Sequence, residues 1–192
     1  MSARASGRLN VTITHLEMRS RPRLTLPHPG VKLALLRAEE PTASFYRYLY
    51  NCVGENWLWT DRRILDDERL LAVIRDPNVE IYVLHVAGVP AGYAELARLD
   101  GGVELSYFGL MPEFIGRRLG PWFLEASVDL AWSGEPEKLF VQTCTLDHPK
   151  ALALYQRAGF VPVRQEKITR ADPRLSGIVP MTTAPHVPIG GA

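Results

Sequence analysis

The spacing of apolar residues changes near residue 79, and this change limits the folds open to the chain. Two segments before it repeat apolar side chains at intervals of three and four, which is typical of helices. Three segments after it are short, apolar and separated by glycine-containing turns, which is typical of antiparallel strands. The pattern predicts helices over 41–53 and 66–75 and strands over 79–86, 93–99 and 103–111.

The remaining segments alternate between strands and helices. The patterns predict strands over 9–18, 31–37, 138–143 and 160–168, and helices over 119–132 and 149–158. Three strands in a meander followed by strand–helix–strand–helix–strand favour a mixed α/β fold (α+β). We expect a central, mixed but mostly antiparallel sheet with helices on both faces.

Proline-rich segments flank this pattern and indicate the domain organisation. Residues 20–30 carry three prolines and a glycine, and residues 171–192 carry four prolines. We therefore expect an N-terminal extension with one strand over 1–30, one main domain over 31–170, and an extended Pro-rich tail over 171–192. A tail of this kind can pack on a neighbouring chain, so a homodimer is a possible partner arrangement.

Composition excludes several classes of partner. The 22 basic residues are balanced by 21 acidic ones, which gives no electrostatic reason to expect nucleic acid. No apolar run approaches the length of a membrane span, and the N-terminus lacks the apolar stretch of a secretory signal, so we expect a cytoplasmic protein. Cys52 and Cys144 form no CxxC pair and no cluster with zinc spacing, so we expect no metal.

The segment 110–120 joins a predicted strand to an amphipathic helix through a short loop with two glycines. Such a loop directs free N–H groups and the positive end of the helix dipole at one spot, which suits a phosphate or pyrophosphate. The dinucleotide fingerprint, the Walker loop and the hydrolase nucleophile elbow are all absent. A plain strand-to-helix turn remains the alternative interpretation.

Two motifs in this chain resemble those of the GNAT acetyltransferase superfamily. Leu110-Met111-Pro112 and then 115–120 resemble the pyrophosphate-binding motif Gln/Arg-x-x-Gly-x-Gly/Ala with its apolar-x-Pro lead-in. The segment 148–160 resembles Asn-x-x-Ala-x-x-Leu-Tyr-x-x-x-Gly-Phe. The resemblance covers roughly residues 31–167. It implies the GNAT acyl-CoA N-acyltransferase fold and acetyl-CoA as co-substrate.

The resemblance also implies a cofactor-binding set. Leu110 is expected to offer a backbone N–H to the thioester carbonyl, with Gly109 as a plausible β-bulge beside it. The pyrophosphate is expected over Ile115, Gly116, Arg117, Arg118, Leu119 and Gly120, and the pantetheine beside His148. Ile115, Arg118 and His148 depart from the usual Gln/Arg, Gly and Asn. Both arginines suit phosphates, or else pair with Glu113 or Glu125 on the helix surface.

Amine acetylation needs a proton acceptor for the amine and a proton donor for the departing thiolate. Tyr155 occupies the position of the family's general acid, although a tyrosine at this spacing also suits a helix core. Glu104 lies 11 residues before the first motif position, an offset that resembles the catalytic glutamate of the histone acetyltransferase branch. Glu95 and a water chain are the alternatives. The ribosomal-protein N-terminal acetyltransferases have their catalytic base 12 residues before the tyrosine. Thr143 stands at that position here, so the resemblance does not imply their mechanism.

The acceptor site is expected between the first two helices, as in the superfamily. The loop there carries Trp57 and Trp59 beside acidic residues, and these rings either border a cationic amine or pack against the sheet. We expect an N-acetyltransferase that moves an acetyl group to a small-molecule or peptide amine in a ternary complex. The alternative is an acyl-CoA sensor with little or no turnover.

Overall fold

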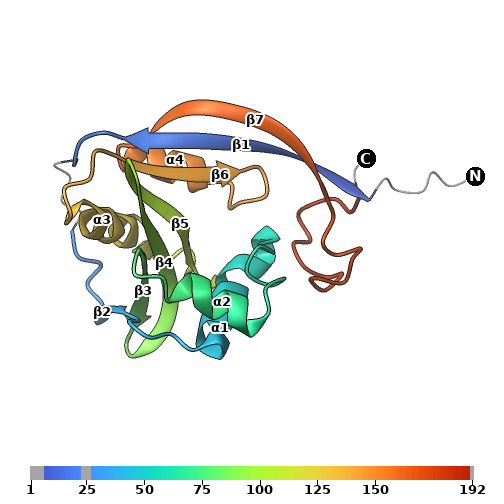
Figure 1. Ribbon diagram of the computed structural model, residues 1–192, viewed down its shortest axis with the longest axis horizontal. Coiled ribbons are helices and arrows are strands. Elements are labelled where there is room, and N and C mark those ends of the chain that lie inside the picture. The colour runs from blue at the N-terminus through green and yellow to red at the C-terminus, as the bar shows by residue number, and fades with distance from the viewer. Residues whose placement is uncertain (1–6, 23–26, 191–192) are drawn as a thin grey trace, which may run out of the picture.

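Seven strands form one sheet in the computed structural model, which describes residues 7–22 and 27–190 (Figure 1). The order across the sheet is β2-β3-β4-β5-β6-β1-β7, and β5 and β6 form the one parallel pair among the described strands. The strands are β1 (Arg8–Met18), β2 (Leu33–Arg37), β3 (Val79–Val86), β4 (Val89–Leu99), β5 (Gly102–Leu110), β6 (Leu139–Cys144) and β7 (Val161–Ala171). Residues 1–6, 23–26 and 191–192 of the predicted extension and tail lie outside the described residues.

Helices cover both faces of this sheet. α1 (Ala43–Gly54) and α2 (Asp67–Ile74) pack on one face, and α3 (Leu119–Trp132) and α4 (Ala151–Arg157) pack on the other. Thr42 and Asp66 cap α1 and α2 by accepting hydrogen bonds from Phe45 N and Arg69 N. Two short 3₁₀ turns, Glu55–Trp57 and Pro112–Phe114, connect helices and strands beside the site.

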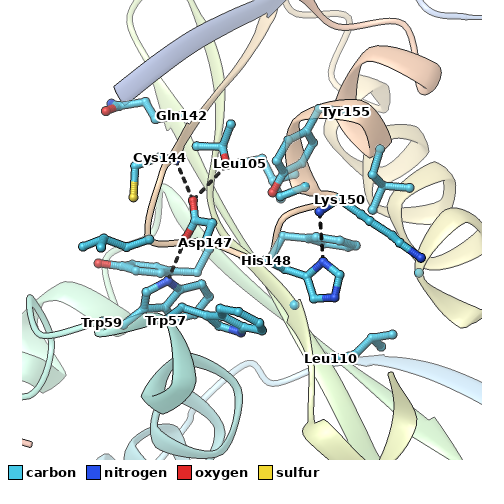
Figure 2. Close-up of a pocket in the computed structure, with 18 of the residues that line it drawn as sticks. Trp57, Trp59, Leu105, Leu110, Gln142, Cys144, Asp147, His148, Lys150 and Tyr155 are labelled. Atoms are coloured by element: carbon cyan, nitrogen blue, oxygen red, sulfur yellow. Dashed lines mark hydrogen bonds between the residues drawn. The ribbon is translucent and has the colours of Figure 1, made fainter. Parts of the chain in front are cut away.

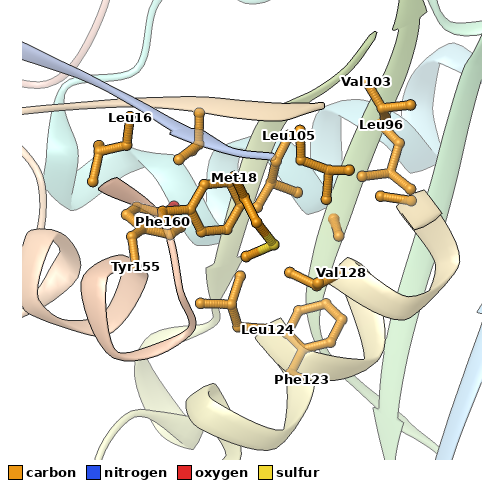
Figure 3. Packing of buried hydrophobic residues seen from close by; sticks show 14 of the residues in the cluster. Leu16, Met18, Leu96, Val103, Leu105, Phe123, Leu124, Val128, Tyr155 and Phe160 are labelled. Carbon is orange, nitrogen blue, oxygen red and sulfur yellow. The ribbon is translucent and has the colours of Figure 1, made fainter. Parts of the chain in front are cut away.

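The largest core cluster of the described residues lies between the sheet and the helices α3 and α4 (Figure 3). Phe123, Leu124 and Val128 of α3 are buried there at the spacing of one helix face. They meet buried residues of the strands and of α4, namely Leu16, Met18, Leu96, Val103, Leu105, Tyr155 and Phe160. This packing fixes the start of α3 and Tyr155 of α4 against the same strands.

The predicted fold class is confirmed: the sheet is mixed and mostly antiparallel, with helices on both faces. The strand 79–86 and the helix 119–132 begin and end where the sequence predicts. The turn expected at residues 88–90 is shorter, because Ala87 and Gly88 have φ of 50° and 87° and close the hairpin alone. β4 therefore begins at Val89.

A β-bulge lies at Ser106 in β5 and not at Gly109 as expected. Leu105 pairs with Leu96 and Tyr107 with Glu95, so Ser106 is the extra residue. The bulge shifts the alternation of side chains, and Phe108 joins the α3 side while Tyr107 joins the α1 side. Gly109 is needed for a different reason, because a Cβ atom there would lie 2.4 Å from Cγ1 of Val53.

The N-terminal strand belongs to the interior of the sheet. β1 pairs antiparallel with β6 on one side and with β7 on the other. Although residues 1–30 are expected to form an extension, β1 thus fills a place in the same sheet as the rest of the predicted domain. This pairing joins segments about 150 residues apart, which local sequence patterns do not report.

The C-terminal segment 172–190 is folded, although an extended tail is expected. Arg174 is 3% exposed, forms an ion pair with Asp172 at 2.7 Å, and donates to the carbonyls of Val187 and Pro188. Val179 and Ala184 pack on buried residues of β1 and of two loops, namely Leu9, Val11, Leu58 and Leu146. A buried arginine that binds several carbonyls holds proline-rich chain in one shape without regular secondary structure.

Candidate active site

The strands β5 and β6 separate after three paired residues, and this separation opens the centre of the sheet. The pairs run only from Val103 to Leu105 on β5 and from Leu139 to Val141 on β6. A cavity of about 550 Å³ lies beyond them, lined by both strands. Its other walls are the loop after α1, the N-terminus of α3, α4, and the neighbouring strands β1 and β7.

The structure brings the two sequence motifs together at this cavity. Of the residues predicted for the site, those that line it are Trp57, Trp59, Gly109, Leu110, Ile115, Gly116, Arg118, Leu119, Gly120, His148 and Tyr155. Arg117 and Glu104 are not in the lining. Segments from both halves of the chain thus meet at one cavity, while the role of each residue stays a prediction.

The N-terminus of α3 presents unpaired N–H groups at one end of the cavity. No acceptor within the described residues takes a hydrogen bond from the N–H of Gly116, Arg117 or Arg118. The first residues of a helix also lack intrahelical acceptors. α3 has neither a side-chain cap nor an acidic residue in its first turn. The positive end of its dipole therefore suits an anionic group such as a pyrophosphate.

Arg118 has a left-handed backbone, with φ of 61° and ψ of 20°. This is the position at which the resembling motif has a glycine, and Gly116 before it also has positive φ, 84°. A left-handed conformation costs a residue with a side chain about 1–2 kcal/mol. The chain keeps the loop's shape without the glycine, and a conformation of this cost is typical of functional loops.

Three cationic side chains line the cavity beside α3 and α4. Arg118, Lys150 and Arg157 are exposed, and none pairs with a carboxylate of the described residues. Arg117 instead lies over the ring of Phe114, with 5.0 Å from its guanidinium carbon to the ring centroid. The expected alternative, ion pairs with Glu113 or Glu125, is not found for either arginine within the described chain. Unpaired cations suit phosphate groups.

A hydrogen bond orients the His148 ring, and its surroundings favour the neutral form. Its Nδ1 accepts a hydrogen bond from Lys150 N at 3.1 Å (Figure 2). Burial, followed by the charges of Lys150 and His186, lowers the pKa of His148 below its ordinary value. The neutral ring therefore carries its proton on Nε2, which is free to donate to a carbonyl in the cavity.

Tyr155 lies on the cavity wall with its ring in the core. The ring contacts Phe108 and Phe160 edge-on, at centroid distances of 6.3 and 5.9 Å. Its hydroxyl has no hydrogen-bond partner among the described residues. Burial, and then the negative charge of Asp147, raises the pKa of Tyr155, so the hydroxyl stays protonated at neutral pH. It is therefore present as a hydrogen-bond donor and not as a phenolate.

Glu104 lies one side chain behind the cavity wall. Its carboxylate accepts hydrogen bonds from Ser106 Oγ at 3.4 Å and from Gln142 Nε2 at 3.5 Å. Ser106 and Gln142 both line the cavity. Glu104 thus has contact with the cavity through two polar side chains, and its own carboxylate does not reach the lining.

Glu95, the alternative carboxylate, is enclosed in the core. It is 1% exposed, pairs with Arg62 at 2.8 Å and accepts a hydrogen bond from the Tyr46 hydroxyl. It is not among the residues that line the cavity. Its carboxylate oxygens are taken up by Arg62 and Tyr46 and do not reach a molecule in the cavity.

Trp57 and Trp59 line the end of the cavity away from α3. Leu58 between them has φ of 57°, and this left-handed turn sends its own side chain into the core. Trp57 packs between His148 and His186, at centroid distances of 5.3 and 5.4 Å. Trp59 packs on Tyr50 and Tyr107. The rings both line the cavity and pack on neighbouring aromatic side chains, while contact with a cationic amine stays a prediction.

Five charged residues of the cavity lining were not predicted as site residues, namely Asp61, Asp147, Lys150, Arg157 and Arg170. Asp147 accepts hydrogen bonds from Thr143 Oγ1 and Cys144 N, both at 2.8 Å, and from Trp59 Nε1 at 3.4 Å (Figure 2). Its place directly before His148 in the second motif was a signal for it. Arg170 reaches the cavity only because β7 lies beside β1, and no local signal indicates that.

Within 7–22 and 27–190, no three His, Cys, Asp or Glu side chains are placed to hold a metal ion. Over the same ranges, no helix has the length and apolar character needed to cross a membrane.

Comparison with known structures finds similar folds. A conserved protein of unknown function from Staphylococcus epidermidis aligns with a TM-score of 0.59 and 14% identity, over 86% of this chain and 63% of that one. An aminoglycoside acetyltransferase from an uncultured soil metagenomic sample aligns with a TM-score of 0.55 and 17% identity, over 66% and 86%. A variant of the Vibrio cholerae spermidine N-acetyltransferase gives 0.53 and 18%, over 74% and 95%.

At these low identities, the structural alignments show a shared fold. This chain spans less than two thirds of the Staphylococcus epidermidis protein. A search of curated proteins finds no match. Residues 40–160, more than half of the chain, match the family described as the Acetyltransferase (GNAT) family. The chain therefore belongs to the GNAT family of N-acetyltransferases, which use acetyl-CoA to acetylate amines.

Proposed function

We propose that the protein is an active N-acetyltransferase that moves an acetyl group from acetyl-CoA to a primary amine by direct attack in a ternary complex. One observation carries the proposal: a single cavity has two ends of different chemistry, with the Tyr155 hydroxyl on its wall. One end offers cations and free N–H groups. The other offers indole rings and the carboxylates of Asp61 and Asp147.

The first end fits the phosphates of acetyl-CoA. The unpaired N–H groups at the start of α3 suit the pyrophosphate, and Arg118, Lys150 and Arg157 add positive charge around it. His148 Nε2 is a donor for a pantetheine carbonyl. When bound, acetyl-CoA supplies the activated acetyl group, and these residues hold and orient it.

The chemistry requires a proton donor beside the departing thiolate. The raised pKa of Tyr155 keeps its hydroxyl protonated, so it can donate a hydrogen bond to the departing sulfur. We assign it as the source of the thiol proton because it lies on the cavity wall at the position of the family's general acid. The N–H of Leu110 is the proposed donor to the thioester carbonyl, as the family resemblance implies. Both groups belong to rigid elements, which favours a fixed reaction geometry.

The amine must lose a proton before or during attack. We assign Glu104 as the terminal acceptor, reached through the Ser106 hydroxyl and a water molecule, since Ser106 both lines the cavity and donates to Glu104. This relay replaces direct contact between Glu104 and the amine. The residue that would pass the proton, Ser106, is also the extra residue of the β5 bulge.

Thiol release and acetyl-CoA binding, measured together, test the proposal. Wild type should bind acetyl-CoA by calorimetry and release CoA thiol with at least one member of a panel of amino acids, polyamines, aminoglycosides and peptides. Tyr155→Phe should bind acetyl-CoA equally and turn over about 10²-fold more slowly. Binding without turnover by any amine would support the alternative, an acyl-CoA sensor, which the departures at Ile115, Arg118 and His148 favour.

A further inference from the structure

Arg170 differs from the other partly or fully buried arginines among the described residues. Arg47, Arg62, Arg63, Arg98 and Arg174 each form an ion pair with an aspartate or a glutamate. Arg170 is half-buried and donates from Nη2 to Thr60 Oγ1 at 2.8 Å. Within the described chain, no carboxylate pairs with it.

A guanidinium withdrawn from water normally has an opposite charge beside it, because its lost hydration must be replaced. Thr60 satisfies only one of the five N–H donors of Arg170. No other nitrogen of Arg170 is buried without a partner, and the residue lines the cavity. Its remaining donors are therefore open to a bound molecule, and their geometry suits a carboxylate.

A carboxylate of the protein lies in the same region without neutralising Arg170. The Cys144 thiol lies within electrostatic reach of both groups: burial and then Asp147 raise its pKa to about 11, while Arg170 acts in the opposite direction. Asp147 and Arg170 are both in the cavity lining, yet they form no ion pair. The cavity lining therefore contains both a negative group and a positive group that do not neutralise each other by an ion pair.

The wall around these charges is apolar. Val11 and Ile13 of β1 and Ile168 of β7 line the cavity near Arg170 in the paired strands β1 and β7. A ligand that matches all of these features has an ammonium or amine, a carboxylate and an apolar side chain. Polyamines and aminoglycosides have no carboxylate for Arg170, and their additional positive charges are repelled by it.

Resting on the proposed acetyl transfer, we propose that the acceptor is an amino acid with an apolar side chain, whose carboxylate binds Arg170 while its amine points to Tyr155. The amine nitrogen forms a bond to the acetyl carbon as the carbon–sulfur bond breaks. The ammonium loses one proton to the Glu104 relay to become the attacking amine, and the nitrogen loses a second proton to solvent after its bond to the acetyl carbon forms. The sulfur gains one proton from Tyr155, which recovers a proton from solvent, so one proton is released overall. The products are an N-acetyl amino acid and the CoA thiol.

A matched substrate series on the wild-type protein tests the carboxylate. Leucine, leucinamide, 3-methylbutylamine and spermidine are compared by kcat/KM for thiol release. Leucine should exceed the amide and the simple amine by about ten- to a hundred-fold, as expected for a charge-assisted pair. The amide has the more acidic ammonium and hence more free amine at neutral pH, so a preference for leucine opposes that bias.

Variants of Arg170 assign the preference to this residue. Arg170→Gln should raise the KM for leucine about ten- to a hundred-fold and leave the KM values for acetyl-CoA and leucinamide unchanged. The KM of Arg170→Lys for leucine should lie between those of the wild type and Arg170→Gln. Arg164→Gln is the matched control, because Arg164 lies on the same strand, is exposed and does not line the cavity.

Leucine binding to the CoA-bound protein, followed by tryptophan fluorescence, separates this inference from the proposed function. Leucine binding that needs Arg170, with no turnover of any amine, would contradict the acetyl transfer and keep the carboxylate site. Turnover with spermidine or leucinamide as good as with leucine would overturn the carboxylate site and keep the acetyl transfer. Equal leucine affinity in wild type and folded Arg170→Gln or Arg170→Lys would also overturn the carboxylate site.

Discussion

A Cβ atom at Gly54 would lie only 2.3 Å from Cε3 of the Trp59 indole. The last residue of α1 must therefore lack a side chain for Trp59 to take its place on the cavity wall. The indole also packs on Tyr50 and Tyr107 and donates to Asp147, so it is held from several directions. A contact between the end of a helix and the loop after it thus shapes the acceptor end of the cavity.

Gly54→Ala should move Trp59 and affect the acceptor more than the cofactor. We expect a loss of about 1–3 kcal/mol in the free energy of unfolding, as for overpacking of a well-filled site. The amine KM should rise more than the acetyl-CoA KM. Denaturant unfolding and steady-state kinetics measure both. Gly134→Ala is the control, since a Cβ there meets only the guanidinium end of Arg98, at 3.2 Å. Equal changes in both KM values would count against this placement of the acceptor.

Arg118→Gly should change stability and cofactor affinity in different directions. Glycine removes the cost of the left-handed backbone but adds entropy to the unfolded chain, so we expect between no change and a gain of about 1 kcal/mol. Loss of the guanidinium should weaken acetyl-CoA binding about ten-fold. Thermal unfolding and calorimetry provide the two values. Unchanged acetyl-CoA affinity in the folded variant would remove Arg118 from the phosphate site.

Glu104→Gln should lower kcat at neutral pH by about 10²-fold, and the defect should shrink at high pH, where the amine arrives neutral. Ser106→Ala should show a smaller defect with the same pH dependence, because Ser106 connects Glu104 to the cavity. A pH–rate series on one good amine provides the test, with the exposed Glu137→Gln as the control. Wild-type activity of Glu104→Gln across the pH range would assign proton transfer to a water chain.

Acetyl-CoA affinity should fall as His148 becomes protonated. Its pKa lies below the ordinary value, so the ring is neutral at pH 7 and gains a proton only as the pH falls through that lowered pKa. In the neutral ring, Nδ1 accepts a hydrogen bond from Lys150 N. The added proton occupies this nitrogen, so Nδ1 no longer accepts and the hydrogen bond is lost. Calorimetry between about pH 7 and pH 5 should show a steeper loss for wild type than for His148→Asn. Identical slopes would show that His148 does not contribute.

The sequence predicted most elements because their signals are local. The helix over α3 and the strand β3 follow from the spacing of apolar residues within each segment, and both ends agree with the structure. The family resemblance rested on two short motifs, one at α3 and one at α4. The folded state brings both motifs to one cavity because β5 and β6, which precede them, pair for only three residues.

Other features depended on contacts between distant segments, which local patterns do not encode. The bulge at Ser106 lets Phe108 pack on the α3 side of the sheet and Tyr107 on the α1 side. Gly109 lacks a side chain because Val53 of α1 occupies the space next to it. The 172–190 segment is folded by Arg174, whose partners include Asp172 and several distant carbonyls. Proline content alone predicted an extended tail there.

The chain's sequence by itself determined the fold class, the family and the loop at the start of α3, because periodicity and motif spacing are properties of contiguous residues. The tertiary structure decided which charges share the cavity. It set Glu104 behind Ser106, enclosed Glu95 with Arg62, and brought Arg170 to the acceptor end through the pairing of β7 with β1. These placements depend on strand register and burial, which balance long-range packing against the cost of desolvating each charge.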